Sequence, residues 1–194
     1  MKKSTIAFIA VAAVLVLWAI SVYNGLVNQD ETVNNAWAKV ESDYQRRADL
    51  IPSLVSTVKG YAKHEKDTYE AVVNARSKAT QTTISVDDLT EENMQRFQQA
   101  QGELSSALSR LIAVQENYPE LKANENFMDL QKQLEGTENR IKESRNNFND
   151  AAKAYNIAVR KFPGNIVAMI FGFQQKPMFK SAEGADKAPE ISFD

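Results

Sequence analysis

The chain has 194 residues, and its seven glycines and five prolines are too few for a loop-rich β-sandwich, a collagen-like fibre or a long disordered chain. It has no cysteine, which excludes disulfides and zinc–thiolate sites, and its single histidine excludes histidine-rich metal sites. The 23 basic side chains are balanced by 25 acidic ones, so the positive charge that nucleic-acid binding requires is missing. We expect a helical protein without a nucleic-acid partner.

The N-terminal segment carries the strongest local signal. Residues 6–22 are apolar except for Ser21, and after Lys2 and Lys3 the next charged residue is Asp30. As a helix this run measures roughly 26 Å, close to the ~30 Å thickness of a bilayer's hydrocarbon core. The segment is therefore predicted to cross a membrane once.

The charges beside this segment predict its orientation. Lys2 and Lys3 precede it, whereas Asp30 and Glu31 follow it, and positively charged flanks stay on the cytoplasmic side. We expect the N-terminus inside and the rest of the chain outside. The alternative is a cleaved signal peptide with its cut after Ser21, which we disfavour because the apolar run exceeds the ~7–15 residues of a signal core.

The first helix beyond the anchor is expected over residues 31–76. One heptad position is apolar throughout most of this segment and carries Trp37, Tyr44, Ile51, Val58 and Val72. The pattern stays in register through Pro52, so we predict one kinked helix rather than two. Because proline has no N–H, the carbonyl of Ala48 should need a bend or a compensating side chain. Residues 78–90 are predicted to form the next loop, on the side far from the membrane.

A second helix is predicted over residues 91–118. Thr90 is suited to cap it, and Pro119 is suited to close it. Its apolar positions form two adjacent columns, Phe97, Leu104, Leu111 and Tyr118 in one and Ala100, Ala107 and Val114 in the other. The connection at 119–123 is short, which predicts that the second and third helices are antiparallel neighbours.

The clearest helix is predicted over residues 124–162. A large apolar side chain occupies every seventh position, namely Phe127, Leu134, Ile141, Phe148, Tyr155 and Phe162. The companion column is mostly small and consists of Leu130, Thr137, Ser144, Ala151 and Ala158. Small residues beside large ones let a neighbouring helix approach closely. Pro163 and Gly164 should end the helix.

The remaining C-terminal residues fall into two parts. Residues 166–173 are apolar but too few to span a bilayer, so they should form a short helix against the bundle. Residues 174–194 should be a mobile tail, although Ile191 and Phe193 are candidates for docking.

These elements predict three segments of chain and an all-α architecture. Residues 1–29 form the cytoplasmic stub and transmembrane anchor, residues 30–173 an elongated antiparallel bundle, and residues 174–194 the tail. The bundle should have three long helices and a short C-terminal one, with the first and third long helices roughly parallel, and coiled-coil-like seams between them.

Two groups of polar residues need a role. Arg47 shares a heptad column with Val40 and Leu54, so its guanidinium should turn inward and pair with Glu138 or Glu135 of the third helix. An ion pair that fixes helix register is favoured over a binding site for an acidic ligand. Asn149 and Asn156, seven residues apart, are expected to supply hydrogen bonds along the seam rather than to recognise a ligand.

The single histidine does not complete a metal site. His64 and Glu65 begin like a zinc-protease helix motif, but position 68 is Thr68 where the second histidine is needed. His64 is better explained as a packed or half-exposed surface residue. We predict no catalytic, cofactor-binding or metal-binding residues and no cofactor, and the sequence leaves the binding residues unassigned.

Several long stretches resemble the LemA family of bacterial membrane-anchored proteins. They include AWAKVESDYQRRADLIPSLVSTVKGYAKHE at residues 36–65, ENYPELKANENFMDLQKQLEGTENRI at 116–141 and FPGNIVAMIFGF at 162–173. The resemblance implies one N-terminal membrane helix in the bacterial inner membrane, an extracytoplasmic helical domain and no established enzymatic activity. It also implies work alongside other envelope proteins, membrane metalloproteases among them.

Three functions remain open at this point. The favoured one is a membrane-tethered interaction or scaffold protein of the envelope that contacts partner proteins or copies of itself. A structural spacer that holds something at a set distance from the bilayer is the main alternative. An uncharacterised hydrolase is the least favoured, because no acidic or nucleophilic side chain is paired with a base in the sequence.

Overall fold

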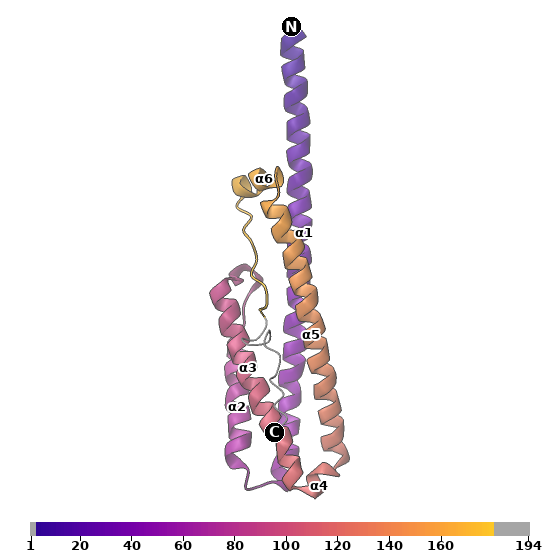
Figure 1. The fold of residues 1–194 in the computed structure, drawn as a ribbon, viewed down its shortest axis with the longest axis vertical. Coiled ribbons are helices and arrows are strands. Elements are labelled where there is room, and N and C mark those ends of the chain that lie inside the picture. Colours follow the sequence, from indigo (N-terminus) through magenta and orange to yellow (C-terminus); the bar gives the residue numbers. More distant parts are fainter. Residues whose placement is uncertain (1–2, 181–194) are drawn as a thin grey trace, which may run out of the picture.

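The computed structural model describes residues 3–180, and every regular element in this part of the chain is a helix (Figure 1). The elements are α1 (Lys3–Tyr61), α2 (Lys66–Gln81), α3 (Glu91–Ala113), α4 (Pro119–Lys122), α5 (Glu125–Arg160) and α6 (Gly164–Phe171), with the short 3₁₀ helices η1 (Val86–Asp88) and η2 (Val114–Asn117). The predicted all-α bundle of long helices with a short C-terminal helix is confirmed.

Helices α1 and α5 make the most extensive helix–helix contact of the bundle and run in opposite directions (Figure 1). Phe127, at the start of α5, packs in one cluster with Val58 of α1, whereas Tyr155, near the end of α5, packs in the other cluster with Leu26. We call the end of the bundle near Leu26 and α6 the proximal end, and the end at residues 62–65 and α4 the distal end. The prediction that the first and third long helices are parallel is wrong.

An additional reversal of the chain explains this error. The helix predicted over 31–76 ends at Tyr61, and the chain turns back within residues 62–65 to begin α2. The heptad pattern continues across the turn because Val72 of α2 is buried in the same core as Val58 of α1. Helix α3 is antiparallel to α5, as predicted. The two are not main neighbours, however, because α3 packs chiefly against α2 and α5 packs chiefly against α1.

Helix α1 runs through Pro52 without interruption. The carbonyl oxygen of Ala48, which proline leaves without its usual donor, accepts a hydrogen bond from Arg76 Nε at 2.8 Å. Arg76 belongs to α2, so the proline site also joins two helices. The prediction of a compensating side chain at this turn is confirmed.

The same helix contains two environments in succession. Its N-terminal part is long and apolar enough to cross a membrane, and none of it is buried within the described structure. Val14, for example, is 65% exposed, whereas Val33 and Trp37 further along α1 are fully buried. No turn separates the two parts, so the apolar segment continues directly into the core of the bundle.

The predicted seams of α3 and α5 form the core. Six large residues were expected to form one column of the helix predicted over 124–162. The five from Phe127 to Tyr155 lie on α5 and are buried, whereas Phe162 is 74% exposed. Phe162 was wrongly included because α5 ends at Arg160, two residues before it. On α3, Phe97, Leu104 and Leu111 are buried as predicted, and the side chain of Thr90 caps the helix by accepting a hydrogen bond from the N–H of Asn93.

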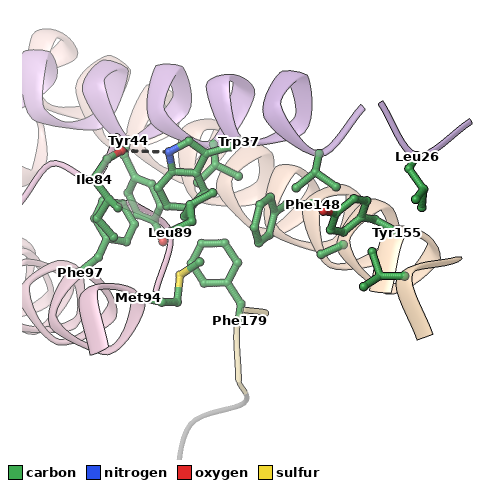
Figure 2. Packing of buried hydrophobic residues seen from close by; sticks show 14 of the residues in the cluster. Leu26, Trp37, Tyr44, Ile84, Leu89, Met94, Phe97, Phe148, Tyr155 and Phe179 are labelled. Carbon is green, nitrogen blue, oxygen red and sulfur yellow. Dashed lines mark hydrogen bonds between the residues drawn. The ribbon is translucent and has the colours of Figure 1, made fainter. Parts of the chain in front are cut away.

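Aromatic side chains fill the proximal half of the core (Figure 2). The Trp37 ring lies 5.4 Å from that of Phe97 and 5.3 Å from that of Phe148, measured between centroids. Its indole Nε1 donates a 3.1 Å hydrogen bond to the carbonyl oxygen of Ile84. This bond places residues 82–90 beside Trp37, at the proximal end of the α2–α3 hairpin (Figure 1). The loop at 78–90 was predicted to lie on the side far from the membrane. That prediction is wrong, because the loop lies at the proximal end and begins only after α2 ends at Gln81.

The C-terminal run forms α6, which packs against both α5 and α1. This confirms the predicted short helix, with bounds Gly164–Phe171 instead of 166–173. Residues 174–180 then run without helix or strand back along the bundle toward α3 (Figure 1). We call residues 174–180 the strap.

Candidate functional site

The buried Arg47 side chain joins three helices. Its Nη1 donates hydrogen bonds to Ser105 Oγ of α3 at 2.8 Å and to Glu138 Oε1 of α5 at 2.9 Å. Its Nη2 donates to the side-chain and main-chain oxygens of Gln101 on α3. Arg47 is 1% exposed, so its charge is compensated from within the chain. The predicted pairing with Glu138 is confirmed.

The surroundings of Arg47 favour a structural role. The guanidinium carbon lies 5.0 Å from the centroid of the Tyr44 ring, within the range of a cation–π contact. Burial raises the pKa of Tyr44, although the positive charges of Arg145 and Arg47 oppose this effect. Glu135, the other predicted partner, instead accepts a hydrogen bond from Gln131. Four hydrogen bonds already occupy both terminal nitrogens of Arg47, which leaves them no free N–H directed at a ligand.

The strap is held by two asparagines of α5. Asn156 donates a 2.8 Å hydrogen bond to the carbonyl of Lys176 and accepts one of 2.8 Å from its N–H. Asn149 binds the main chain of Phe179 in the same two-bond manner, at 3.0 and 2.8 Å. Seven residues of helix rise about 10.5 Å and three extended residues span about 10 Å, so the two spacings match. The asparagines supply hydrogen bonds to the strap instead of to the helical seam.

Phe179 fixes the end of the strap in the core (Figure 2). Its ring is buried, with its centroid 5.6 Å from that of Phe148 and 6.0 Å from that of Trp37. The Arg145 guanidinium covers it at 4.5 Å. Residues 174–194 were predicted to be a mobile tail. For the strap this prediction is wrong, because its residues are packed against the bundle. Ile191 and Phe193, the predicted docking candidates, lie outside the described residues.

A cavity of about 390 Å³ opens between α1, α2 and α3. Tyr44 and Gln101 line it, so it lies beside the Arg47 network, and Ala38, Thr80 and Leu104 contribute to its walls. The lining mixes small, hydroxyl, amide and apolar side chains with one carboxylate, that of Glu41. Burial raises the pKa of Glu41, so the cavity offers a ligand shape, hydrogen bonds and one acidic group.

The residues considered for metal chemistry lie at the distal end. His64 is exposed in the turn at 62–65, and Glu65 accepts a 3.2 Å hydrogen bond from the hydroxyl of Tyr118. This bond ties the α1–α2 turn to the chain before α4. Among the described residues, no group of three potential ligands gathers at one point.

Four of the residues that complete these contacts were not predicted from the sequence. Gln101 and Ser105 lie four residues apart and therefore on one face of α3, a signal that could have marked them as partners for Arg47. Phe179 is a large apolar residue in a polar segment, which is the kind of isolated anchor that docks a tail. Arg76 gives no such signal, because only the reversal at 62–65 brings it to Ala48.

These features define a class of protein: a helical bundle whose first helix continues outward as an exposed apolar segment long enough to cross a membrane. The chain belongs to the LemA family, whose model matches residues 36–193. The family assignment confirms the resemblance carried by the sequence stretches quoted above. Together, the family and the apolar helix indicate a membrane-associated protein.

Individual relatives are identical to this chain at about a quarter of their aligned residues or fewer. The chain is 26% identical over 181 residues to magnetosome protein MamQ 2 of Paramagnetospirillum magneticum, covering 84% of this chain and 66% of the relative. A magnetosome protein MamQ of Magnetospirillum gryphiswaldense is 25% identical with the same coverage. Protein LemA of Metamycoplasma hominis is 22% identical over 160 residues, covering 82% of this chain and 69% of the relative. The chain thus spans just under two thirds of the length of the MamQ relatives.

Proposed function

We propose that this protein is a membrane-tethered, non-enzymatic interaction or scaffold protein of the bacterial envelope. One observation carries the proposal, which is the continuity of α1. The helix that supplies the exposed apolar segment also supplies Trp37 and Val58 to the core of the bundle. A flexible linker would uncouple the bundle from the bilayer, whereas an unbroken helix transmits the position of one to the other.

The proposed topology places a single membrane span in the inner membrane, with a cytoplasmic N-terminus and the bundle outside. Lys2 and Lys3 before the span and Asp30 and Glu31 after it support this orientation. Retention of the span is part of the proposal, since a cut after Ser21 would release the bundle.

The polar interior supports a non-enzymatic role. The donors on the terminal nitrogens of Arg47 are bonded to Ser105, Glu138 and Gln101, and Asn149 and Asn156 are bonded to the strap. These polar groups hold the fold together and, being bonded within the chain, are not directed at a substrate. The partners proposed are other envelope proteins, with a membrane metalloprotease as a lead from the family, or further copies of this chain.

The alternative of a structural spacer is favoured by the length of α1. Its 59 residues extend about 90 Å at 1.5 Å per residue, of which about 30 Å is needed for the membrane. The remainder would hold the distal turn at 62–65 at a defined height above the bilayer. Deletion of matched heptads from α1 and α5 should abolish the function of a spacer while partner binding persists.

The interaction proposal is tested by crosslinking in living cells. The chain has no cysteine, so single cysteines on exposed positions of α2 and α5, such as Val73→Cys and Lys132→Cys, can carry one photocrosslinker each. Reproducible adducts with one envelope protein or with a second copy are expected from one face of the bundle. Absence of adducts from every face, with the protein intact in its membrane, would contradict the proposal.

A further inference from the structure

Helix α6 carries an exposed apolar surface that nothing in the described structure covers. Val167 and Ala168 face the bundle and are 3% and 2% exposed, whereas Met169 and Ile170 on the next positions are 78% and 68% exposed. Together with Phe162, Ile166 and Phe171, the exposed residues define what we call the α6 patch. A group of large apolar side chains this exposed marks an interaction surface in a stable protein.

The position of α6 along α1 indicates what covers this patch. The Phe171 ring lies 4.8 Å from the ring of Tyr23, and Phe173 lies 5.6 Å from it. A Cβ at Gly164 would lie 3.8 Å from Val22 Cγ1 of α1, an ordinary van der Waals distance, so the start of α6 is also next to α1. Helix α6 is thus fixed beside the last turn of the apolar run at 6–22.

Simple helix geometry gives the depth of this turn. Tyr23 follows Lys3 by twenty residues, which amounts to about 30 Å of helix, equal to the thickness of the hydrocarbon core. If the lysines lie in one headgroup layer, Tyr23 lies in the other, where amphipathic aromatic rings are favoured. Helix α6 therefore stands at the same membrane–water boundary.

The composition around α6 fits that boundary. No charged residue occurs between Phe162 and Phe173, and Asn165 is the one side chain in the helix with a polar group. The exposed residues Arg160 and Lys161 come directly before this stretch. Apolar side chains beside basic ones are the combination that holds a short helix in the interface of a bilayer with anionic headgroups.

We propose that α6 is a second membrane contact, with its exposed apolar residues inserted into the outer edge of the hydrocarbon beside α1. The inference rests on the proposed membrane span and adds to it. A single span would leave the bundle free to tilt, whereas a second contact beside the span fixes both the tilt and the rotation of α1. The face of the bundle that carries the strap then keeps one fixed orientation relative to the membrane surface.

The test measures the depth of labelled cysteines in the full chain. An environment-sensitive fluorophore is attached to Met169→Cys, to Val14→Cys in the span and to Lys132→Cys on the distal part of α5. Each protein is reconstituted in vesicles of phosphatidylcholine and phosphatidylglycerol, with and without brominated acyl chains. We expect bromine quenching at positions 14 and 169 and none at position 132.

The outcomes separate the two proposals. Quenching at position 14 without quenching at position 169 would overturn the α6 contact and leave the span intact. Loss of quenching at both positions would overturn the span itself.

A charge substitution tests the same contact by a second route. The double variant Met169→Asp/Ile170→Asp should fold, because both side chains are exposed, and should abolish the quenching of a label at Phe162→Cys. The matched control Val73→Asp/Met128→Asp adds the same charge at exposed apolar positions of α2 and α5 and should leave that quenching unchanged. Equal quenching in both double variants would overturn the proposal.

Discussion

Arg47 joins three helices through one buried guanidinium, which is bonded to Glu138 of α5 and to Ser105 and Gln101 of α3. Glu138 supplies the negative charge, as the heptad position of Arg47 indicated. Ser105 and Gln101 share one face of α3 and could be recognised as a pair, but which atoms they offer to Arg47 depends on the depth and rotation of α3. At such sites the sequence pattern predicts that a buried charge needs hydrogen-bond partners. The three-dimensional packing determines which atoms those partners are.

The Glu138 pair leads to a first prediction. Glu138→Ala removes the carboxylate from a buried guanidinium and should lower the free energy of unfolding by about 1–2 kcal/mol, less than for a fully buried pair because Glu138 is 42% exposed. Glu135→Ala, which removes the neighbouring carboxylate one turn away, should change it by less than about 0.5 kcal/mol. Denaturant unfolding in detergent measures both. Equal losses would show that Arg47 does not depend on Glu138.

Tyr155 gives a prediction on pH. Burial, assisted by the nearby charge of Asp30, raises its pKa to about 12 from an ordinary value of 10.0. The folded state therefore keeps the phenolic proton that the unfolded state loses. Stability from this residue is complete below pH 10 and should decline as the pH rises toward 12.

The variant Tyr155→Phe isolates this effect. It removes the ionisable group while retaining the ring, so the fall in stability above pH 10 should be smaller in the variant than in the natural chain. Ultraviolet titration of phenolate formation should also lose its last step. Loss of amplitude near pH 10, with the last step retained, would show that another tyrosine ionises last.

At the scale of the elements, the apolar periodicities predicted helices well and chain reversals poorly. The seams of α3 and α5 and the cap at Thr90 follow from local residue types. The turn at 62–65 does not, because α2 presents Val72 to the same core and so prolongs the pattern of α1 across the break. Omission of that one turn reversed the expected direction of α5 relative to α1 and misplaced the loop at 82–90.

The strap shows a second limit. Its residues are few and mostly polar, so only Phe179 near its end indicates a packed segment. Its position depends on Asn149 and Asn156, some thirty and twenty residues earlier in the chain. The two asparagines form structural hydrogen bonds as expected, but to the strap and not along the seam. These partners could not be predicted, since a heptad pattern describes contacts between helices and not contacts with an extended segment.

The contact between α1 and α2 at Pro52 leads to a prediction for these elements. Arg76→Met leaves the buried carbonyl of Ala48 without a donor and should cost about 1–2 kcal/mol of unfolding free energy. In a Pro52→Ala background, the restored N–H of residue 52 can bond to that carbonyl. The same Arg76→Met change should then cost about 1 kcal/mol less. Additive losses in the double-mutant cycle would show that Arg76 does not compensate for the proline.

In the molecule as a whole, the proposed membrane anchoring requires α1 to serve as anchor and core helix at once. The exposed apolar turns, the contacts of Tyr23 with α6 and the buried Trp37 all belong to one helix. If the apolar segment is retained in the membrane, the bundle stands directly on the bilayer. Its distal end, which holds the turn at 62–65 and α4, is then the end of the described structure furthest from the surface.

The most direct test is thiol labelling in intact cells with a reagent that cannot cross the inner membrane. The chain contains no cysteine, so Lys132→Cys reports the location of the bundle and Ser4→Cys that of the N-terminus. We expect that, once the reagent has access to the outer face of the inner membrane, Lys132→Cys is labelled and Ser4→Cys is labelled only after lysis. Both proteins should remain in the membrane after an alkaline wash. Labelling of Lys132→Cys only after lysis, or its release into the soluble fraction, would show that the proposed anchoring is wrong.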